Sequence, residues 1–246
     1  MRREGVRRAR LCCSWFVMFL HWAGVTRAHL VFWELFDCGM GKQLHIWKRL
    51  IASSMLMVLM VFVWYSFPSK TGPACMPNCA FNNFSGHDLS GADLRGGNFT
   101  QANLQSSNLQ HVSFYLADLT DANLRGSTLS RADLSQSILS QADLRGADLR
   151  GAMLRGADLR QADLRDADLK RADLRGANLH QANLMRAVLT SATFTEANLS
   201  EANLRRADLT NSVLRRADLR GADLRLAMLG NADVNGADMN GALITE

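Results

Sequence analysis

Every fifth residue from Phe84 to Ile244 of this 246-residue chain is a large apolar side chain, and the period never slips. These 33 centre positions hold 26 leucines, and the residue two places before the centre is alanine in 25 of them. Aspartate or asparagine usually stands between the two, and two polar or glycine residues follow, as in ADLRGADLRG from residue 142. A repeat sustained over this length restricts the fold before any local propensity is considered.

The period excludes an α-helix and favours a strand. Five residues of a helix advance by about 500°, so successive leucines would step around the axis by about 140° and form no apolar face. In a strand, the centre and the small residue two places before it point to the same side, and the aspartate between them points to the other. Each repeat therefore predicts one very short strand, with its alanine and leucine directed inward.

A single short strand cannot bury its leucine, but a coiled chain can. Stacking successive turns at about 4.8 Å would bury every centre and pair the backbones of neighbouring coils. The two residues after each centre would form a corner, and glycine there, as at Gly146, Gly151, Gly156 and Gly176, suits a tight turn. The sequence predicts an all-β solenoid.

The A-[D/N]-L-x-x motif of residues 82–246 resembles the pentapeptide-repeat family. The resemblance implies a right-handed quadrilateral β-helix with four repeats per coil, hence about eight coils and a rod of about 40 Å. On that arrangement residues twenty apart stack, and one inner column contains Leu104, Leu124, Leu144, Leu164, Leu184 and Leu204.

Family members that protect DNA gyrase are strongly acidic, carry projecting loops and dimerise through a C-terminal helix. Residues 71–246 carry 18 Lys/Arg against 20 Asp/Glu, and the unbroken register admits no loop. These departures weigh against protection or inhibition of a DNA-handling enzyme by duplex mimicry, which we keep as the alternative function. They make nucleic acid an improbable partner as well.

Residues 50–69 form an uncharged run of twenty residues between Lys48-Arg49 and Lys70. A helix of that length spans a hydrocarbon core of about 30 Å, and Trp64 and Tyr65 suit the interface. We predict an N-terminal transmembrane α-helix that acts as an uncleaved signal anchor and contacts the membrane.

The basic segment 1–49 leaves the topology open. Met40 begins a complete signal-anchor pattern, so residues 1–39 are interpreted as an extension from a mis-assigned start or as peripheral. A single span would place a bacterial inner-membrane protein with its repeats in the periplasm, following the positive-inside rule. A second span at residues 11–26 would return the repeats to the cytoplasm.

Two cysteines, Cys75 and Cys79, lie in residues 70–81, which we interpret as a linker and N-terminal cap. Their spacing is compatible with a disulfide in an oxidising compartment, and two unpaired thiols are the alternative. A zinc site is disfavoured, because no further Cys or His pair lies nearby in the sequence.

Arginines after the centres would form an outer column at Arg125, Arg145, Arg165, Arg205 and Arg225, interrupted by Met185. The favoured interpretation is a solvated face with weak ion pairs to neighbouring aspartates. The functional interpretation is a surface that binds an anionic partner.

No set of residues resembles a catalytic site, so we predict no enzymatic activity, no cofactor and no metal. The repeats contain no cysteine and only three histidines, His87, His111 and His180, at different repeat positions. A rod filled by its own alanines and leucines also leaves no obvious internal pocket. The leading hypothesis is a membrane-tethered, non-enzymatic module that binds an unknown protein, with association of copies through the C-terminal coil.

Overall fold

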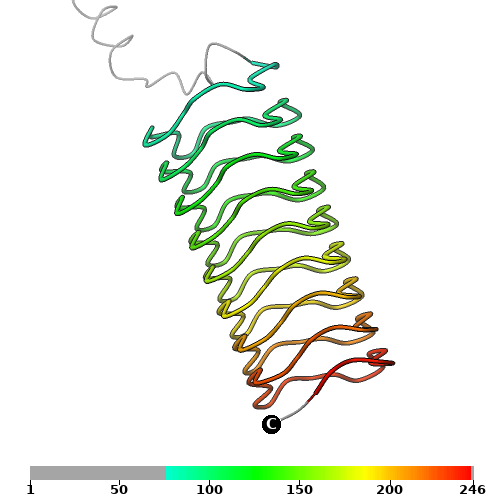
Figure 1. Cartoon of the computed structure of the whole chain (residues 1–246). Helices are drawn as coiled ribbons and strands as arrows, with labels where there is room; N and C mark the ends of the chain where they lie inside the picture. Colours follow the sequence, from blue (N-terminus) through cyan, green and yellow to red (C-terminus); the bar gives the residue numbers. More distant parts are fainter. Residues whose placement is uncertain (1–75, 245–246) are drawn as a thin grey trace, which may run out of the picture. The chain divides into compact units, whose positions relative to one another are not determined.

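The computed structural model describes residues 76–244, which form one continuous stack of coils (Figure 1). Outside the described residues lie the predicted basic segment 1–49 and the predicted transmembrane helix 50–69. Residues 70–75 of the predicted linker, and the last two residues, Thr245 and Glu246, lie outside them as well. A search of residues 76–244 found no helix with the length and hydropathy of a membrane span.

The strands of residues 76–244 are each reduced to a single bridge residue, the one before the centre. Each pairs in parallel with the residue twenty positions later, from Asn78 with Asn98 to Asp223 with Leu243. Four repeats therefore complete one coil, which confirms the predicted β-solenoid. The rod therefore has four faces, and we number each face by the bridge residues stacked on it. Face 1 runs from Asn83 to Leu243, face 2 from Asp88 to Met228, face 3 from Asp93 to Asp233 and face 4 from Asn78 to Asp238.

The backbone hydrogen bonds explain why five residues suffice for one side of a coil. In the repeat of Leu104, two amides donate to the next coil and one donates to the preceding coil. The amide of Ser107 closes the corner by donating to the carbonyl of Leu104 at 3.3 Å. The fifth amide, that of Gln105, has no backbone acceptor and donates instead to Oδ1 of Asn103 at 3.2 Å. The aspartate or asparagine before each centre thus completes the hydrogen bonding of its own turn.

The second residue after each centre, which we call the second turn residue, has a positive φ throughout residues 76–244. Together with the bond that closes the corner, this conformation is typical of a type II turn. Glycine occupies 11 of these positions, including Gly146 and Gly176, and other residues occupy 22. The prediction that glycine makes the tight turns possible therefore holds for only a third of the corners. At the other corners a residue with a side chain adopts the left-handed conformation.

Leucine and alanine side chains fill the interior completely. The column of Leu104, Leu124, Leu144, Leu164, Leu184 and Leu204 is at most 1% exposed, and the inward alanines between Ala102 and Ala222 are equally buried. Near the N-terminal end the rings of Phe84, Phe99 and Phe114 contact one another, with centroids 6.1 and 5.2 Å apart. The interior coils form a continuous packed core, and several inward residues of the first and last coils are only partly buried.

The first coil begins one repeat earlier than the motif indicates. Asn78 already forms a bridge, and Cys79 occupies a fully buried centre position, so residues 76–81 belong to the coil rather than to a separate linker. Proline and cysteine in place of alanine and leucine hide this repeat in the sequence. Cys79 is disulfide-bonded. Pairing with Cys75 stays a prediction.

The last coil is less well covered than the interior coils. Its inward residues Leu229 and Met239 are only partly buried, and Leu243 and Ile244 are about half exposed. Within the described residues, no segment covers this end of the stack.

Candidate interaction surface

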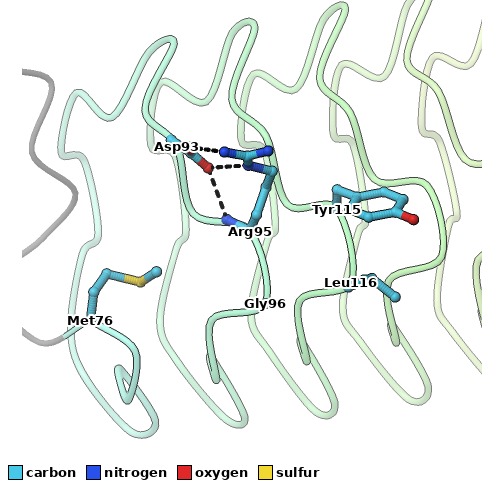
Figure 2. Close-up of a pocket in the computed structure, with 6 residues that line it drawn as sticks. All are labelled: Met76, Asp93, Arg95, Gly96, Tyr115 and Leu116. Atoms are coloured by element: carbon cyan, nitrogen blue, oxygen red, sulfur yellow. Dashed lines mark hydrogen bonds and ion pairs between the residues drawn. The ribbon is translucent and has the colours of Figure 1, made fainter.

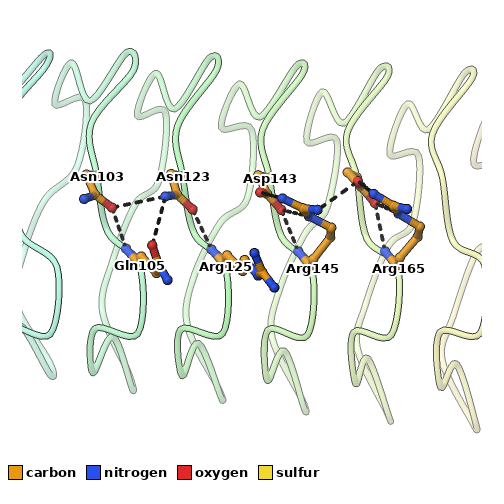
Figure 3. A network of polar contacts seen from close by, with 8 residues as sticks. Asn103, Gln105, Asn123, Arg125, Asp143, Arg145 and Arg165 are labelled. Atoms are coloured by element: carbon orange, nitrogen blue, oxygen red, sulfur yellow. Dashed lines mark hydrogen bonds and ion pairs between the residues drawn. The ribbon is translucent and has the colours of Figure 1, made fainter.

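The outer surface is built from a repeated clamp between the aspartate before the centre and the arginine after it. Asp143 accepts the backbone amide of Arg145 at 3.1 Å, and it also accepts the guanidinium Nε at 2.8 Å and Nη2 at 2.5 Å (Figure 3). The same bidentate pairing occurs at seven further repeats, namely Asp93–Arg95, Asp148–Arg150, Asp158–Arg160, Asp163–Arg165, Asp173–Arg175, Asp218–Arg220 and Asp223–Arg225.

The hydrogen bonds of this clamp shift the pKa values of its aspartates. The pKa of Asp143 lies below its ordinary value, first because the Arg145 side chain donates to its carboxylate and also because the Arg145 amide does. Asp148 and Asp158 have lowered pKa values for the same reason, with Arg150 and Arg160 as donors. These carboxylates are engaged acceptors rather than free negative charges.

Where the residue before the centre is apolar, the arginine reaches the next coil instead. Arg155 follows Met153 and donates to Asp173 at 2.6 Å, and Arg215 follows Val213 and pairs with Asp233. Longer contacts of this kind join Arg145 to Asp163 at 3.7 Å. Charge is therefore balanced along the rod as well as within each repeat.

The predicted arginine column lies on face 1, where Asn123, Asp143 and Asp163 bridge in succession. Arg145, Arg165 and Arg225 are each held by the aspartate of their own repeat. Arg125 and Arg205 follow asparagines; Arg205 lies 3.9 Å from Asp223, and Arg125 makes no ion pair with any residue of 76–244. The structure brings these five residues into one column, but three of them are neutralised.

A shallow, open pocket lies near the N-terminal end, at the corner that follows face 3, and we call it the notch. It measures about 470 Å³ and is lined by Met76, Asp93, Arg95, Gly96, Tyr115 and Leu116. Figure 2 shows Met76, Gly96 and Leu116 on three successive coils, with the Asp93–Arg95 clamp and Tyr115 alongside. Gly96 forms the floor, since a Cβ added there would meet no atom within 4 Å.

Sequence comparison identifies the repeat. The model of the pentapeptide repeats matches residues 98–136, 127–166, 167–206 and 202–242, which is more than half of the 246 residues. The chain belongs to the pentapeptide-repeat family. A comparison with curated protein sequences gives no match.

Solved structures of the family resemble the chain at modest similarity. HetL, a pentapeptide repeat protein involved in heterocyst differentiation regulation from the cyanobacterium Nostoc sp. strain PCC 7120, is 33% identical over 66% of this chain and 89% of its own, with a TM-score of 0.38. QnrB1, a plasmid-mediated fluoroquinolone resistance protein, is 22% identical over 66% and 88%, also with a TM-score of 0.38. A pentapeptide repeat protein from the Arabidopsis thaliana thylakoid lumen is 36% identical over 40% and 65%, with a TM-score of 0.29.

Two residues of this pentapeptide-repeat rod differ in type from the residues at the equivalent positions of most other repeats, and neither was predicted from the sequence to be functional. Tyr115 is the one aromatic residue at the first position after a centre within residues 76–244. Leu116, beside it, is one of three large apolar residues at second turn positions, with Phe81 and Leu226. A position-by-position comparison of the repeats would have revealed both.

Histidines and carboxylates form no reactive group in the described part of this family member. His180 Nδ1 lies 2.9 Å from Ser200 Oγ, whereas His87 and His111 lie at other positions of the repeat. No group of three His, Cys, Asp or Glu residues within 76–244 is arranged to hold a metal ion.

Proposed function

We propose that the rod is a non-enzymatic scaffold whose outer surface binds another protein. The observation that carries this proposal is the filled interior: the inward alanines and leucines of the central coils are buried to within about 2%. Recognition is then left to the outer lattice, which repeats every coil at about 4.8 Å and is stiffened by hydrogen bonds between coils. A regular, rigid surface limits the entropy lost when a partner binds.

The clamps favour this function over duplex mimicry. A mimic of DNA needs a continuous array of exposed negative charge, because the phosphates dominate what a DNA-binding protein recognises. Here Asp143, Asp163 and Asp223 of face 1 each carry an arginine on their carboxylate. We expect micromolar concentrations of the rod to leave DNA supercoiling by gyrase unchanged, and inhibition would support the alternative.

The proposal includes a membrane tether formed by residues 50–69, with the rod outside the bacterial inner membrane. The uncharged run supports the tether, and the disulfide at Cys79 supports an oxidising compartment. A reporter fused after Glu246 tests the compartment, since alkaline phosphatase is active only outside and a fluorescent protein that folds only inside gives the opposite signal. Activity of the inside reporter would contradict the periplasmic placement.

We also propose that copies associate through the C-terminal coil. Its exposed apolar side chains Leu243 and Ile244 support this contact. Replacing Leu243 and Ile244 by aspartate should convert a dimer to a monomer in analytical ultracentrifugation. A wild-type monomer at micromolar concentration would refute it.

Site-specific photocrosslinking in cells tests the scaffold function itself. A photoreactive residue at Ile138 of face 4 or at Met153 of face 3 replaces an exposed side chain, so the fold should be kept. We expect at least one face to crosslink to a defined protein, and a probe at the buried Leu164 to crosslink to none. Absence of a protein crosslink from both of these faces would contradict the proposal.

A further inference from the structure

The notch combines an apolar interior with a neutral polar edge. Met76 and Leu116 lie one coil on either side of Gly96, so two apolar walls flank a floor without a side chain. The edge is formed by Arg95, which donates through Nε and Nη2 to Asp93 at 2.7 and 2.6 Å. Nη1 of Arg95 is left for a further acceptor, and the pair carries no net charge.

Leu116 places an exposed apolar side chain at a corner of the coil. Its φ is +59°, in the left-handed region that most side chains avoid, and 58% of its surface is exposed. The same backbone conformation occurs at 21 other non-glycine corners, and the Leu116 amide donates to the Ser135 carbonyl at 3.2 Å. The side chain is what sets Leu116 apart, since glycine or a polar residue fills 30 of the 33 equivalent corners. An exposed apolar side chain that lines a pocket is a candidate for contact with a partner.

Tyr115 strengthens the inference, because it is an unusual residue type for the first position after a centre and because it lines the same pocket. It is 39% exposed, so its ring offers contact area without being needed for the core. Tyrosine, arginine and methionine are the residues enriched in protein interfaces, and the first two are enriched among those that dominate binding energy.

We infer that the notch binds one large apolar side chain of an extended segment of a partner protein. The side chain lies over Gly96 between Met76 and Leu116, and a neighbouring peptide carbonyl accepts a hydrogen bond from Nη1 of Arg95. The neutral clamp fits an uncharged peptide better than a free anion, because Asp93 cancels the charge that would attract an anion. This inference rests on the proposed scaffold function and gives it a docking point.

Two pairs of variants separate binding from folding. Gly96→Gln fills the notch, and Gly176→Gln is its control, because Gly176 lies in the same corner column with the same φ of +63° and equally empty surroundings. Leu116→Gly removes one wall and relieves the strained backbone. Its control is Leu226→Gly, since Leu226 has a φ of +61° and is 47% exposed at another corner, in the last coil.

The experiment is a peptide-display selection against the full-length chain, followed by affinity measurement on synthetic peptides. We expect selected peptides to share one Leu, Phe, Met or Trp position and to lose at least tenfold in affinity on replacement of that residue by serine. Gly96→Gln and Leu116→Gly should each weaken binding at least tenfold, whereas both controls bind as the wild type does. The thermal midpoint of Leu116→Gly should equal or exceed that of the wild type.

Several results would overturn the inference. Selected peptides that bind Gly96→Gln and Gly176→Gln equally would place their site elsewhere. Vesicles of phosphatidylethanolamine and phosphatidylglycerol that bind in a manner abolished by Gly96→Gln, with no peptide selected, would assign the notch to a lipid surface. A change in sedimentation of the free chain caused by Gly96→Gln alone would assign it to a second copy. Partners that crosslink from other faces while the notch variants have no effect would leave the scaffold function intact and refute only the docking point.

Discussion

The carboxylate of Asp143 accepts three hydrogen bonds from a single residue, Arg145, through its backbone amide and two guanidinium nitrogens. The bond to the amide satisfies the one amide of the repeat that has no backbone acceptor, and the bonds to the guanidinium neutralise the surface. One residue before each centre thus connects the local turn with the charge pattern of the whole rod.

Replacing Asp143 by asparagine and by alanine should separate these two roles. Asparagine keeps an oxygen for the Arg145 amide, as Asn103 does for Gln105, and loses only a partly exposed ion pair, so we expect a loss of about 0.5 kcal/mol. Alanine also leaves the amide without its acceptor, for an expected loss of about 1–2 kcal/mol. Urea unfolding measures both. Equal losses would assign the stabilisation to the ion pair rather than to the turn.

The lowered pKa values of the clamp aspartates predict acid sensitivity. A carboxyl whose pKa is lower in the folded state than its unfolded value of about 3.9 stabilises the fold above that value. This contribution is lost as the pH falls through the lower folded pKa, as for Asp143, Asp148 and Asp158. We expect a thermal midpoint that is level between pH 7 and about pH 5 and falls steadily below about pH 4. A midpoint that rises on acidification would contradict the sign.

The period of five was enough to predict which residues are buried, but not how the turns are satisfied. The spacing of Leu104, Leu124 and Leu144 decides their inward direction, since any strand of this pattern directs its centres to one side. The role of Asn103 could not be read in the same way. Its short side chain reaches the Gln105 amide only in the turn that the coil imposes, and a strand residue in the same sequence would face solvent.

The notch could not be derived from the repeat, because it depends on residues of three coils. Met76, Gly96 and Leu116 meet only when twenty residues complete a coil, and that number came from the family resemblance rather than from the period. Met76 also precedes the visible motif. The sequence contained two usable signals, the aromatic Tyr115 and the apolar Leu116, which stands at a corner where 30 of the 33 repeats carry glycine or a polar residue.

Gly97 should be required by the aromatic ring of its own repeat. It occupies the inward position where alanine is usual, but a Cβ there would lie 2.6 Å from Cε2 of Phe99. We expect Gly97→Ala to lower the stability by about 1–3 kcal/mol, as overpacking of a close-packed core does. Adding Phe99→Leu restores the common Ala-x-Leu pair and should recover most of the loss in thermal unfolding. A single variant as stable as the wild type would show that the ring can move aside.

Ser212→Ala should stabilise the rod. Ser212 is 1% exposed, and of the described residues it is the one whose buried side-chain oxygen has no hydrogen-bond partner. Removing an unsatisfied hydroxyl should gain about 1 kcal/mol. Ser137→Ala is the control, because its Oγ donates to the carbonyl of Leu134 at 2.6 Å and its loss should gain nothing. Equal effects of the two substitutions in urea unfolding would contradict this prediction.

Met153→Asp should also stabilise the rod, on its outer side. Met153 occupies the bridge position of face 3 with 42% of its surface exposed, and its side chain offers no acceptor for the Arg155 amide. An aspartate there can accept that amide and one edge of the Arg155 guanidinium, which now bonds only Asp173. The expected gain is about 1 kcal/mol, chiefly from the turn, because ion pairs at this exposure contribute little. Met153→Asn supplies the acceptor without the charge and should retain most of the gain in urea unfolding, and it should do so at 1 M NaCl as well, where ion pairs are screened. A gain for aspartate that disappears in salt and is absent for asparagine would mean that charge, rather than completion of the turn, determines the choice of residue before each centre.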